Sequence, residues 1–250
     1  MKKKFLVILF VIFTFTLSAC NFTFPMDSKI KAETLNHIST VVMNANVKIN
    51  TSTYKIEFFQ RVEGPVKGSG SGFIIHKETV NQKTFYYVLT NSHVINLDKD
   101  YRHEYKIEDI YNNLVDAELV AENEEYDLAI LKFQSNTELQ VVELASENPQ
   151  KNQTVFSVGS PSGKQNIITA GKIVGYTTIS NVEYEVIVHE AFIHKGSSGS
   201  MLIDESFKLV GINTWGFVME EDNLNDDFVK GGATPIDKIL YFLETIEFDM

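Results

Sequence analysis

The chain has 250 residues, of which 44% are apolar and 12% aromatic, so it can bury a sizeable core and a disordered chain is excluded as the default. Its formal charge at pH 7 is −11. Because an acidic surface repels phosphate backbones, nucleic acid is excluded as an expected partner.

Residues 1–19 have the pattern of a secretory signal peptide. Three lysines, Lys2 to Lys4, precede the apolar run Phe5 to Leu17, which is short for a stable membrane span. The segment Leu17-Ser18-Ala19-Cys20 resembles the bacterial lipobox, in which the cysteine thiol receives diacylglycerol before the leader is cleaved. This resemblance predicts an exported protein, anchored through lipidated Cys20 to the outer face of the bacterial cell membrane. The alternative is a leader cysteine of no consequence.

Residues 20–40 are predicted to form a tether. Pro25 is followed by polar residues with few large apolar ones, and a short helix around Asp27 to His37 is compatible with the pattern. Cys20 is the only cysteine, so no intrachain disulfide is available and stability must come from packing.

From Val41 onward, short β-branched and aromatic runs alternate with turn residues, which predicts an all-β barrel or sandwich. The runs of this first half are Val41 to Met43, Tyr54 to Phe59, Phe73 to Ile75, Phe85 to Thr90 and Val115 to Val120. The glycine-rich stretch Gly68 to Gly72 lies before a strand and not before a helix, so we assign it to a hairpin or bulge and not to a phosphate site.

A polar stretch, Ala145 to Gln153, separates the two halves of the chain, so we predict a first β unit at 41–145 and a second at 146–250. The predicted strands of the second unit are Thr154 to Val158, Ile167 to Tyr176, Tyr184 to His189, Met201 to Asp204 and Lys208 to Asn213. After Pro235, apolar residues recur at spacings of three and four, which predicts an amphipathic C-terminal helix packed on the second unit.

The run from His194 to Ser200 carries the clearest chemical signal. Ser198 stands among glycines in a tight turn, which is how a serine hydroxyl is exposed as a nucleophile. Such a serine needs a histidine base and an acid that orients it. His93 ends a β-rich run and Asp127 enters an apolar strand, so the order along the chain is His, Asp, Ser.

These three segments resemble those of trypsin-like (chymotrypsin-fold) serine peptidases, most of all the bacterial HtrA/Deg group. The likeness extends over roughly residues 40 to 246. It includes the runs Gly68 to Ile75, Val158 to Gly163, Thr169 to Val174 and Gly211 to Gly216.

The resemblance implies two packed six-stranded antiparallel β-barrels with a C-terminal α-helix, and an active site in the cleft between them. It assigns His93, Asp127 and Ser198 to a catalytic triad that hydrolyses peptide bonds through an acyl-enzyme. The backbone N–H groups of Gly196 and Ser198 would form the oxyanion hole. Thr214 would hydrogen-bond Asp127. HtrA proteins usually carry a PDZ domain after the protease domain. The likeness here ends near residue 246, so we expect a protease domain without a PDZ domain.

A specificity pocket is also implied. Its walls map onto Phe192, Ile193, His194, Lys195, Thr214, Trp215, Gly216 and Gly231. The strand Thr214 to Gly216 would bind an extended polypeptide as an added strand. No acid stands at Phe192, which argues against cleavage after Lys or Arg. His194 favours an acidic side chain in the substrate, or is a loop histidine that faces solvent.

We expect no cofactor and no metal. His189 and His194 are five residues apart in a strand and loop, whereas metalloprotease histidines lie four apart on one helix face.

The sequence departs from the family pattern at Ser197, Ser200 and Met201, where Asp or Asn, Gly and Pro are usual. These departures keep open a protease-fold lipoprotein that binds peptides with weak or no catalysis. A third alternative is an unrelated all-β lipoprotein in which the triad is a coincidence. The sequence does not indicate the physiological substrate or the oligomeric state.

Overall fold

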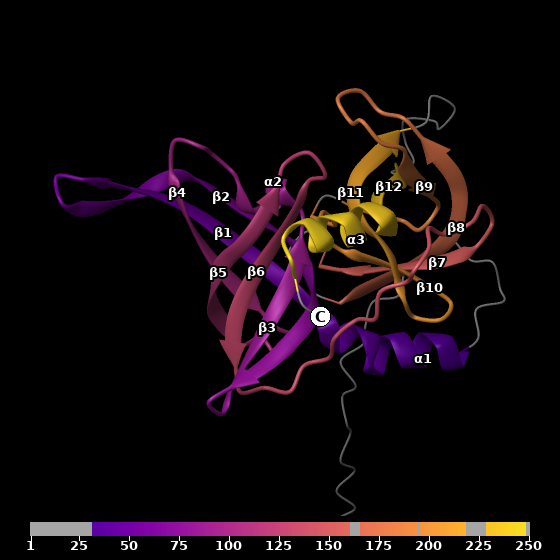
Figure 1. Cartoon of the computed structure of the whole chain (residues 1–250), viewed down its shortest axis with the longest axis horizontal. Coiled ribbons are helices and arrows are strands. Elements are labelled where there is room, and N and C mark those ends of the chain that lie inside the picture. Colours follow the sequence, from indigo (N-terminus) through magenta and orange to yellow (C-terminus); the bar gives the residue numbers. More distant parts are fainter. Residues whose placement is uncertain (1–31, 161–165, 195, 219–228, 249–250) are drawn as a thin grey trace, which may run out of the picture.

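The computed structural model describes residues 32–160, 166–194, 196–218 and 229–248, and in these residues the chain forms two closed, six-stranded antiparallel β-barrels and a C-terminal helix. Figure 1 shows the barrels side by side, the first in violet and magenta and the second in orange. The predicted fold class is therefore confirmed.

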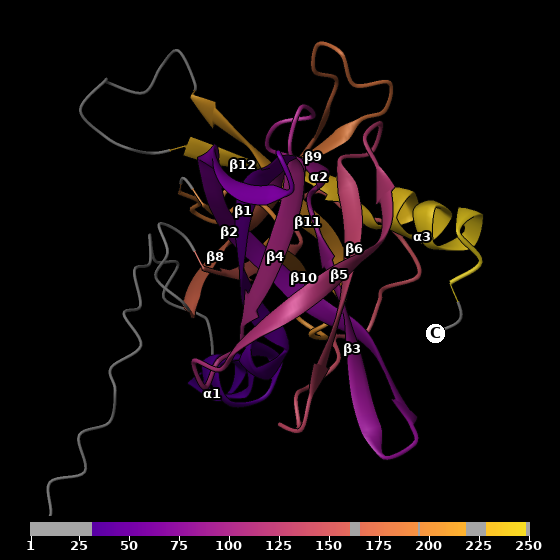
Figure 2. The same ribbon diagram turned by 90° about the vertical axis from the view of Figure 1, so that its left-hand side faces the viewer.

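The first barrel is built from the N-terminal half of the chain, with the strand order β1-β2-β3-β6-β5-β4. Its strands are β1 (Asn46–Glu57), β2 (Gln60–Val80), β3 (Lys83–Thr90), β4 (Arg102–Glu108), β5 (Leu114–Asn123) and β6 (Leu128–Ser135). Beyond the barrel, β1 and β2 continue as a long ribbon, which extends to the left in Figure 1 and toward the viewer in Figure 2.

The second barrel has the strand order β10-β11-β12-β9-β8-β7. Its strands are β7 (Thr154–Gly159), β8 (Ile167–Thr177), β9 (Val186–His189), β10 (Met201–Asp204), β11 (Leu209–Val218) and β12 (Val229–Pro235). One buried apolar cluster runs through both barrels, from Phe73 and Leu128 in the first to Phe156 and Ile212 in the second. The two barrels are thus packed on each other through a shared core.

The glycine-rich stretch, expected in a hairpin or bulge, lies inside β2, in the paired arm of the β1–β2 hairpin and away from its turn. The reason is close packing. A Cβ added at Gly70 would lie 2.6 Å from Val94, and one added at Gly72 would lie 2.6 Å from Val88. The turns at the two ends of β2 are instead made by Phe58-Phe59 and Asn81-Gln82, all four with positive φ.

The last nine residues of the predicted tether form a helix in the structure. Helix α1 (Ala32–Thr40) occupies the last part of residues 20–40, and its Ile38 is fully buried in the core. Val42–Ala45 forms a short 3₁₀ helix, η1, where a strand was predicted at Val41 to Met43. The folded unit therefore begins before residue 41. In Figure 1, α1 lies below the second barrel.

Helix α3 (Ile236–Thr245) confirms the predicted C-terminal helix. It packs against β11 and β12, and its buried residues are Ile236, Ile239, Phe242 and Leu243. In the part of the chain that the structure describes, no helix combines the length and the apolar character that a membrane crossing requires.

Candidate active site

Asp127 and His93 form a close pair in the first barrel. Asp127 Oδ2 lies 2.6 Å from His93 Nδ1, and Asp127 Oδ1 accepts a hydrogen bond of 2.9 Å from the His93 backbone N–H. Because one carboxylate holds both the ring and the main chain of the histidine, the imidazole is fixed in orientation. With Nδ1 as the donor to a carboxylate, Nε2 is the nitrogen left to accept a proton.

Local structure explains how these two side chains meet. Strand β3 ends at Thr90, and His93 follows on the short helix α2 (Ser92–Ile95). Asp127 directly precedes β6 and has a φ of 53°, a left-handed conformation that is uncommon for residues other than glycine. Since β3 and β6 are paired neighbours, the turn after one strand lies beside the turn before the other.

Asn91 joins this pair to the second barrel. Its buried amide nitrogen donates to the Asp127 backbone carbonyl (2.8 Å) and to Thr214 Oγ1 (3.0 Å). Thr214 therefore reaches Asp127 through Asn91 and not by the direct bond that the resemblance implied. Sequence reasoning missed Asn91, although its place two residues before His93 was a usable signal.

Ser198 lies on the loop before β10 in the second barrel, next to the His93 turn. The Ser198 carbonyl accepts a hydrogen bond of 2.8 Å from Ser71 N in β2. A Cβ added at Gly70 would lie 3.1 Å from this carbonyl and 2.6 Å from Val94, the residue after His93. Among the residues that the structure describes, no hydrogen bond joins the Ser198 hydroxyl to His93.

Two backbone N–H groups of this loop have no hydrogen-bond partner among the described residues. Within the described ranges, neither Gly196 N–H nor Ser198 N–H is used in a hydrogen bond. Gly196 has a φ of 92° and Gly199 a φ of 83°, conformations that glycine adopts without strain. In the part of the chain that the structure describes, the loop thus combines a serine hydroxyl with two main-chain donors that no other residue uses.

The three departures from the family pattern are packed into the second barrel. Ser197 Oγ accepts a hydrogen bond from His194 N (2.9 Å), and Ser200 Oγ accepts one from Asn213 Nδ2 (2.8 Å). Met201 is fully buried at the start of β10. All three side chains are therefore hydrogen-bonded or packed within the second barrel.

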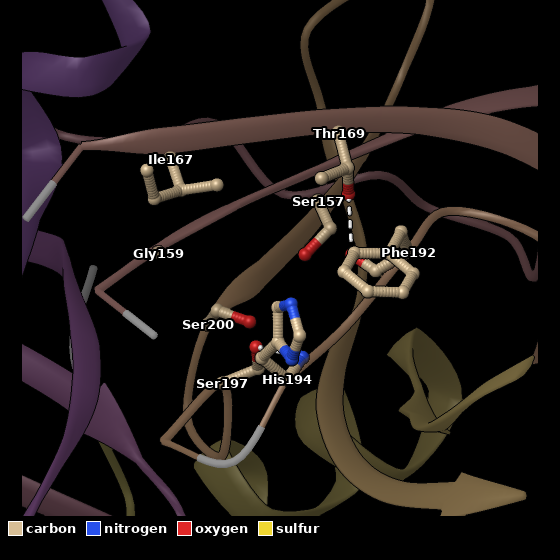
Figure 3. A pocket seen from close by; sticks show the side chains of 8 residues that line it. All are labelled: Ser157, Gly159, Ile167, Thr169, Phe192, His194, Ser197 and Ser200. Carbon is tan, nitrogen blue, oxygen red and sulfur yellow. Dashed lines mark hydrogen bonds between the residues drawn. The ribbon is translucent and has the colours of Figure 1, made fainter. Parts of the chain in front are cut away.

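A small pocket lies beside the loop (Figure 3). Its lining residues are Ser157, Gly159, Ile167, Thr169, Phe192, His194, Ser197 and Ser200. Figure 3 shows the His194 ring in the pocket, near the Phe192 ring, and the two rings meet edge to face with centroids 4.3 Å apart. The Phe192 carbonyl accepts a hydrogen bond from Thr169 Oγ1 (2.7 Å).

The other predicted specificity residues do not line this pocket. Thr214, Trp215 and Gly216 lie on β11, where Gly216 pairs with Gly231 of β12. Ile193 is buried beside the pocket. Lys195 and Cys20 lie outside the described residues.

His189 is a buried polar residue that sequence reasoning considered only as a metal ligand. Its Nε2 lies 2.8 Å from Asn213 Oδ1, while Asn213 Nδ2 donates to the hydroxyls of Ser157 and Ser200. Because the Asn213 amide donates on its other side, Nε2 of His189 carries the proton. Burial lowers the pKa of His189 to about 4, against the smaller opposing effect of the Asn213 hydrogen bond.

Within the described ranges, no three or more His, Cys, Asp or Glu side chains are grouped so that they could hold a metal ion. His189 is buried and His194 is exposed.

Comparison with known proteins gives a consistent result. Residues 70–212, more than half of the chain, match the trypsin-like peptidase domain family. The chain is 30% identical to serine protease HTRA1 of Xenopus laevis over 190 residues, which cover 72% of this chain and 38% of that protein.

It is also 30% identical to serine protease HTRA4 of Mus musculus over 230 residues (84% of this chain, 41% of that protein). It is 29% identical to serine protease Do-like HtrA of Bacillus subtilis (strain 168) over 200 residues (75% and 43%). The chain thus spans about two-fifths of the length of these curated relatives.

Proposed function

Because the chain belongs to the trypsin-like peptidase family, we propose that it is a serine endopeptidase with the triad His93, Asp127 and Ser198. The observation that carries the proposal is the two-point hold of Asp127 on His93, 2.6 Å to the ring and 2.9 Å to the main chain, beside a serine loop with two unused N–H donors.

The proposed reaction begins when Ser198 Oγ attacks the carbonyl carbon of a substrate peptide bond. His93 Nε2 takes the hydroxyl proton, and Asp127 stabilises the imidazolium that forms. The developing oxyanion lies between the N–H groups of Gly196 and Ser198, and each such donor contributes on the order of 3 kcal/mol. His93 then gives its proton to the leaving amine. Water, deprotonated by His93, releases the acyl group from Ser198.

Among the described residues, no hydrogen bond joins the Ser198 hydroxyl to the His93 ring. This does not weigh against the proposal, because catalytic hydrogen bonds in unliganded sites are often long and shorten when substrate binds. The substrate we propose is a polypeptide in extended conformation, bound along Thr214 to Gly216 of β11.

The pocket beside the loop holds Phe192 and His194 and, in its described lining, no acidic side chain. Cleavage after Lys or Arg is therefore not proposed. The exposed His194 ring is the group available to an acidic substrate side chain.

For location, we propose a bacterial lipoprotein whose leader is residues 1–19 and whose lipidated Cys20 holds the enzyme at the outer face of the cell membrane. The support is the sequence Leu17-Ser18-Ala19-Cys20. The lipid-anchored enzyme then acts on exported or unfolded proteins near that membrane. Radiolabelled palmitate incorporation that is lost in Cys20→Ser tests this proposal.

A second candidate function is a protease-fold protein that binds peptides without cutting them. The missing Ser198–His93 hydrogen bond in the described residues favours it. Labelling with a fluorophosphonate separates the two candidates. The proposal predicts covalent labelling of the wild type and none of Ser198→Ala, with both folded. Folded wild-type protein that is not labelled and does not cleave a peptide library would favour the binding protein.

A further inference from the structure

Ser71 is a fully buried residue of β2 in the first barrel. It makes two hydrogen bonds to the loop of the second barrel that carries Gly196 and Ser198. Its N–H donates to the Ser198 carbonyl (2.8 Å), and its hydroxyl donates to the Gly196 carbonyl (3.2 Å). These carbonyls belong to the two peptide groups on either side of the Ser197–Ser198 peptide, which carries the Ser198 N–H.

The direction of the Ser71 hydroxyl is determined by its second partner. Ser160 N–H, at the end of β7, donates to Ser71 Oγ at 2.8 Å. Because the oxygen accepts from this amide, its single proton is left for the Gly196 carbonyl. The Ser71 carbonyl is also held, since it accepts a hydrogen bond of 2.8 Å from Thr90 Oγ1. Every polar group of Ser71 is therefore bonded.

The surroundings leave no room for the loop to move toward Ser71. A Cβ added at Gly199 would lie 2.0 Å from the Ser71 carbonyl oxygen, and one added at Gly159 would lie 3.0 Å from Ser71 Oγ. Gly196, with a φ of 92°, is a glycine and therefore has the widest backbone choice of any residue type. The Ser71 hydroxyl restrains that glycine by its carbonyl.

From this geometry we infer that the Ser71 hydroxyl is a positioning residue for the oxyanion hole. The hydroxyl holds the Gly196 carbonyl on one side of the Ser198 N–H, while the Ser71 N–H holds the Ser198 carbonyl on the other side. The Ser198 N–H and the Gly196 N–H are thereby oriented before substrate binds. The inference rests on the proposed function. Its physical basis is that donors which are oriented in advance stabilise transition-state charge without reorganisation.

The test compares Ser71→Ala and Ser71→Cys with the wild-type full chain. Thr53→Val is the matched control, because the buried Thr53 hydroxyl also accepts from an N–H and donates to a carbonyl, both of Val66, but lies in the β1–β2 ribbon. Three quantities are measured on protein shown to be folded by circular dichroism. They are kcat and KM for a cleaved peptide, the affinity for a peptide boronic acid, and the affinity for the product peptide.

Misaligned oxyanion donors weaken transition-state binding and leave ground-state binding intact. We therefore expect Ser71→Ala to lower kcat and boronate affinity by about tenfold, with KM and product affinity changed less than about threefold. Ser71→Cys, a weak donor of similar size, should lie between Ser71→Ala and the wild type. Thr53→Val should lose thermal stability but keep kcat.

Unchanged kcat and boronate affinity in folded Ser71→Ala would overturn the inference, and so would an equal loss of product affinity. If the wild type itself fails to react with a fluorophosphonate, the proposed function fails and the inference falls with it. If the wild type and the Ser71 variants react with the fluorophosphonate equally well, the proposed function stands and only the inference about Ser71 is overturned.

Discussion

The imidazole of His189 fills the space that a side chain at Gly231 would need. A Cβ added at residue 231 would lie 1.9 Å from Cε1 and 2.2 Å from Nε2 of the ring. The two residues face each other across the β9–β12 pair, where Gly231 is the register partner of His189. Because the His189 ring occupies this space, residue 231 has to be glycine.

We predict that Gly231→Ala lowers the free energy of unfolding by about 1–3 kcal/mol, because overpacking in a rigid core forces neighbours to shift. Urea denaturation measures the loss. In the His189→Ala background the same substitution should cost much less, since the ring is gone, and a double-mutant cycle gives the coupling. Additive effects of the two substitutions would contradict the packing relationship.

Buried His189 also makes stability depend on pH. Its pKa falls from 6.5 to about 4 in the folded state, so below pH 6.5 the unfolded chain binds the proton that the folded chain rejects. Stability therefore rises with pH through this window. We expect a loss of about 2 kcal/mol between pH 6.5 and pH 5, the range in which carboxylates are still largely ionised.

His189→Gln is the control for this pH effect, because glutamine keeps an N–H donor for Asn213 and does not titrate. Its free energy of unfolding, measured by urea denaturation at several pH values, should vary less than that of the wild type between pH 6.5 and pH 5. Equal slopes for the two proteins would show that another group carries the pH dependence.

Asp127→Asn should reduce kcat by about 10³–10⁴-fold, because an amide nitrogen facing Nδ1 favours the tautomer in which Nε2 carries the proton. The fold should be retained, since asparagine has the same shape and its oxygen can still accept from the His93 backbone N–H. Steady-state hydrolysis of a peptide substrate and thermal unfolding check both parts. A fall in kcat below tenfold would remove Asp127 from the proposed triad.

Asn91→Ala should lower both stability and activity. It removes the donor that serves the Asp127 carbonyl and Thr214 Oγ1, and it leaves a buried acceptor unsatisfied at a cost of about 1–3 kcal/mol. The Asp127 backbone, with its φ of 53°, then loses a restraint close to His93. Denaturation and kcat measured on the folded fraction separate the two effects. Wild-type values for both would refute this role for Asn91.

Replacement of Phe58-Phe59 by Asn-Gly should stabilise the protein by about 1 kcal/mol. Both phenylalanines are fully exposed in a two-residue hairpin turn, with φ of 48° and 66°, and asparagine and glycine adopt such angles more readily. Activity should be unchanged. Thermal unfolding is the measurement, and the Asn81-Gln82 hairpin, replaced by Asn-Gly, serves for comparison. A loss of stability would show that the aromatic pair contacts other parts of the protein.

Much of the fold could be predicted from local sequence pattern. The alternation of β-branched and aromatic runs with turn residues predicted the β class, and the apolar spacing after Pro235 predicted α3. The errors arose where tertiary packing outweighed local preference. Gly68 to Gly72 was expected in a hairpin or bulge before a strand, but it lies inside β2, where Gly70 and Gly72 allow close contacts with Val94 and Val88.

The sequence by itself determined the candidate residues His93, Asp127 and Ser198 and their order, because the chemistry of each short motif depends on its own residues. Only the tertiary structure decided that Asn91 bridges Asp127 to Thr214, that His189 lies behind Gly231, and that Ser71 is bonded to the loop of Gly196 and Ser198. These contacts join segments more than 30 residues apart, and those of Asn91 with Thr214 and of Ser71 with Gly196 cross between the two barrels. Side chains at such separations are brought together by barrel closure and packing, which no local pattern encodes.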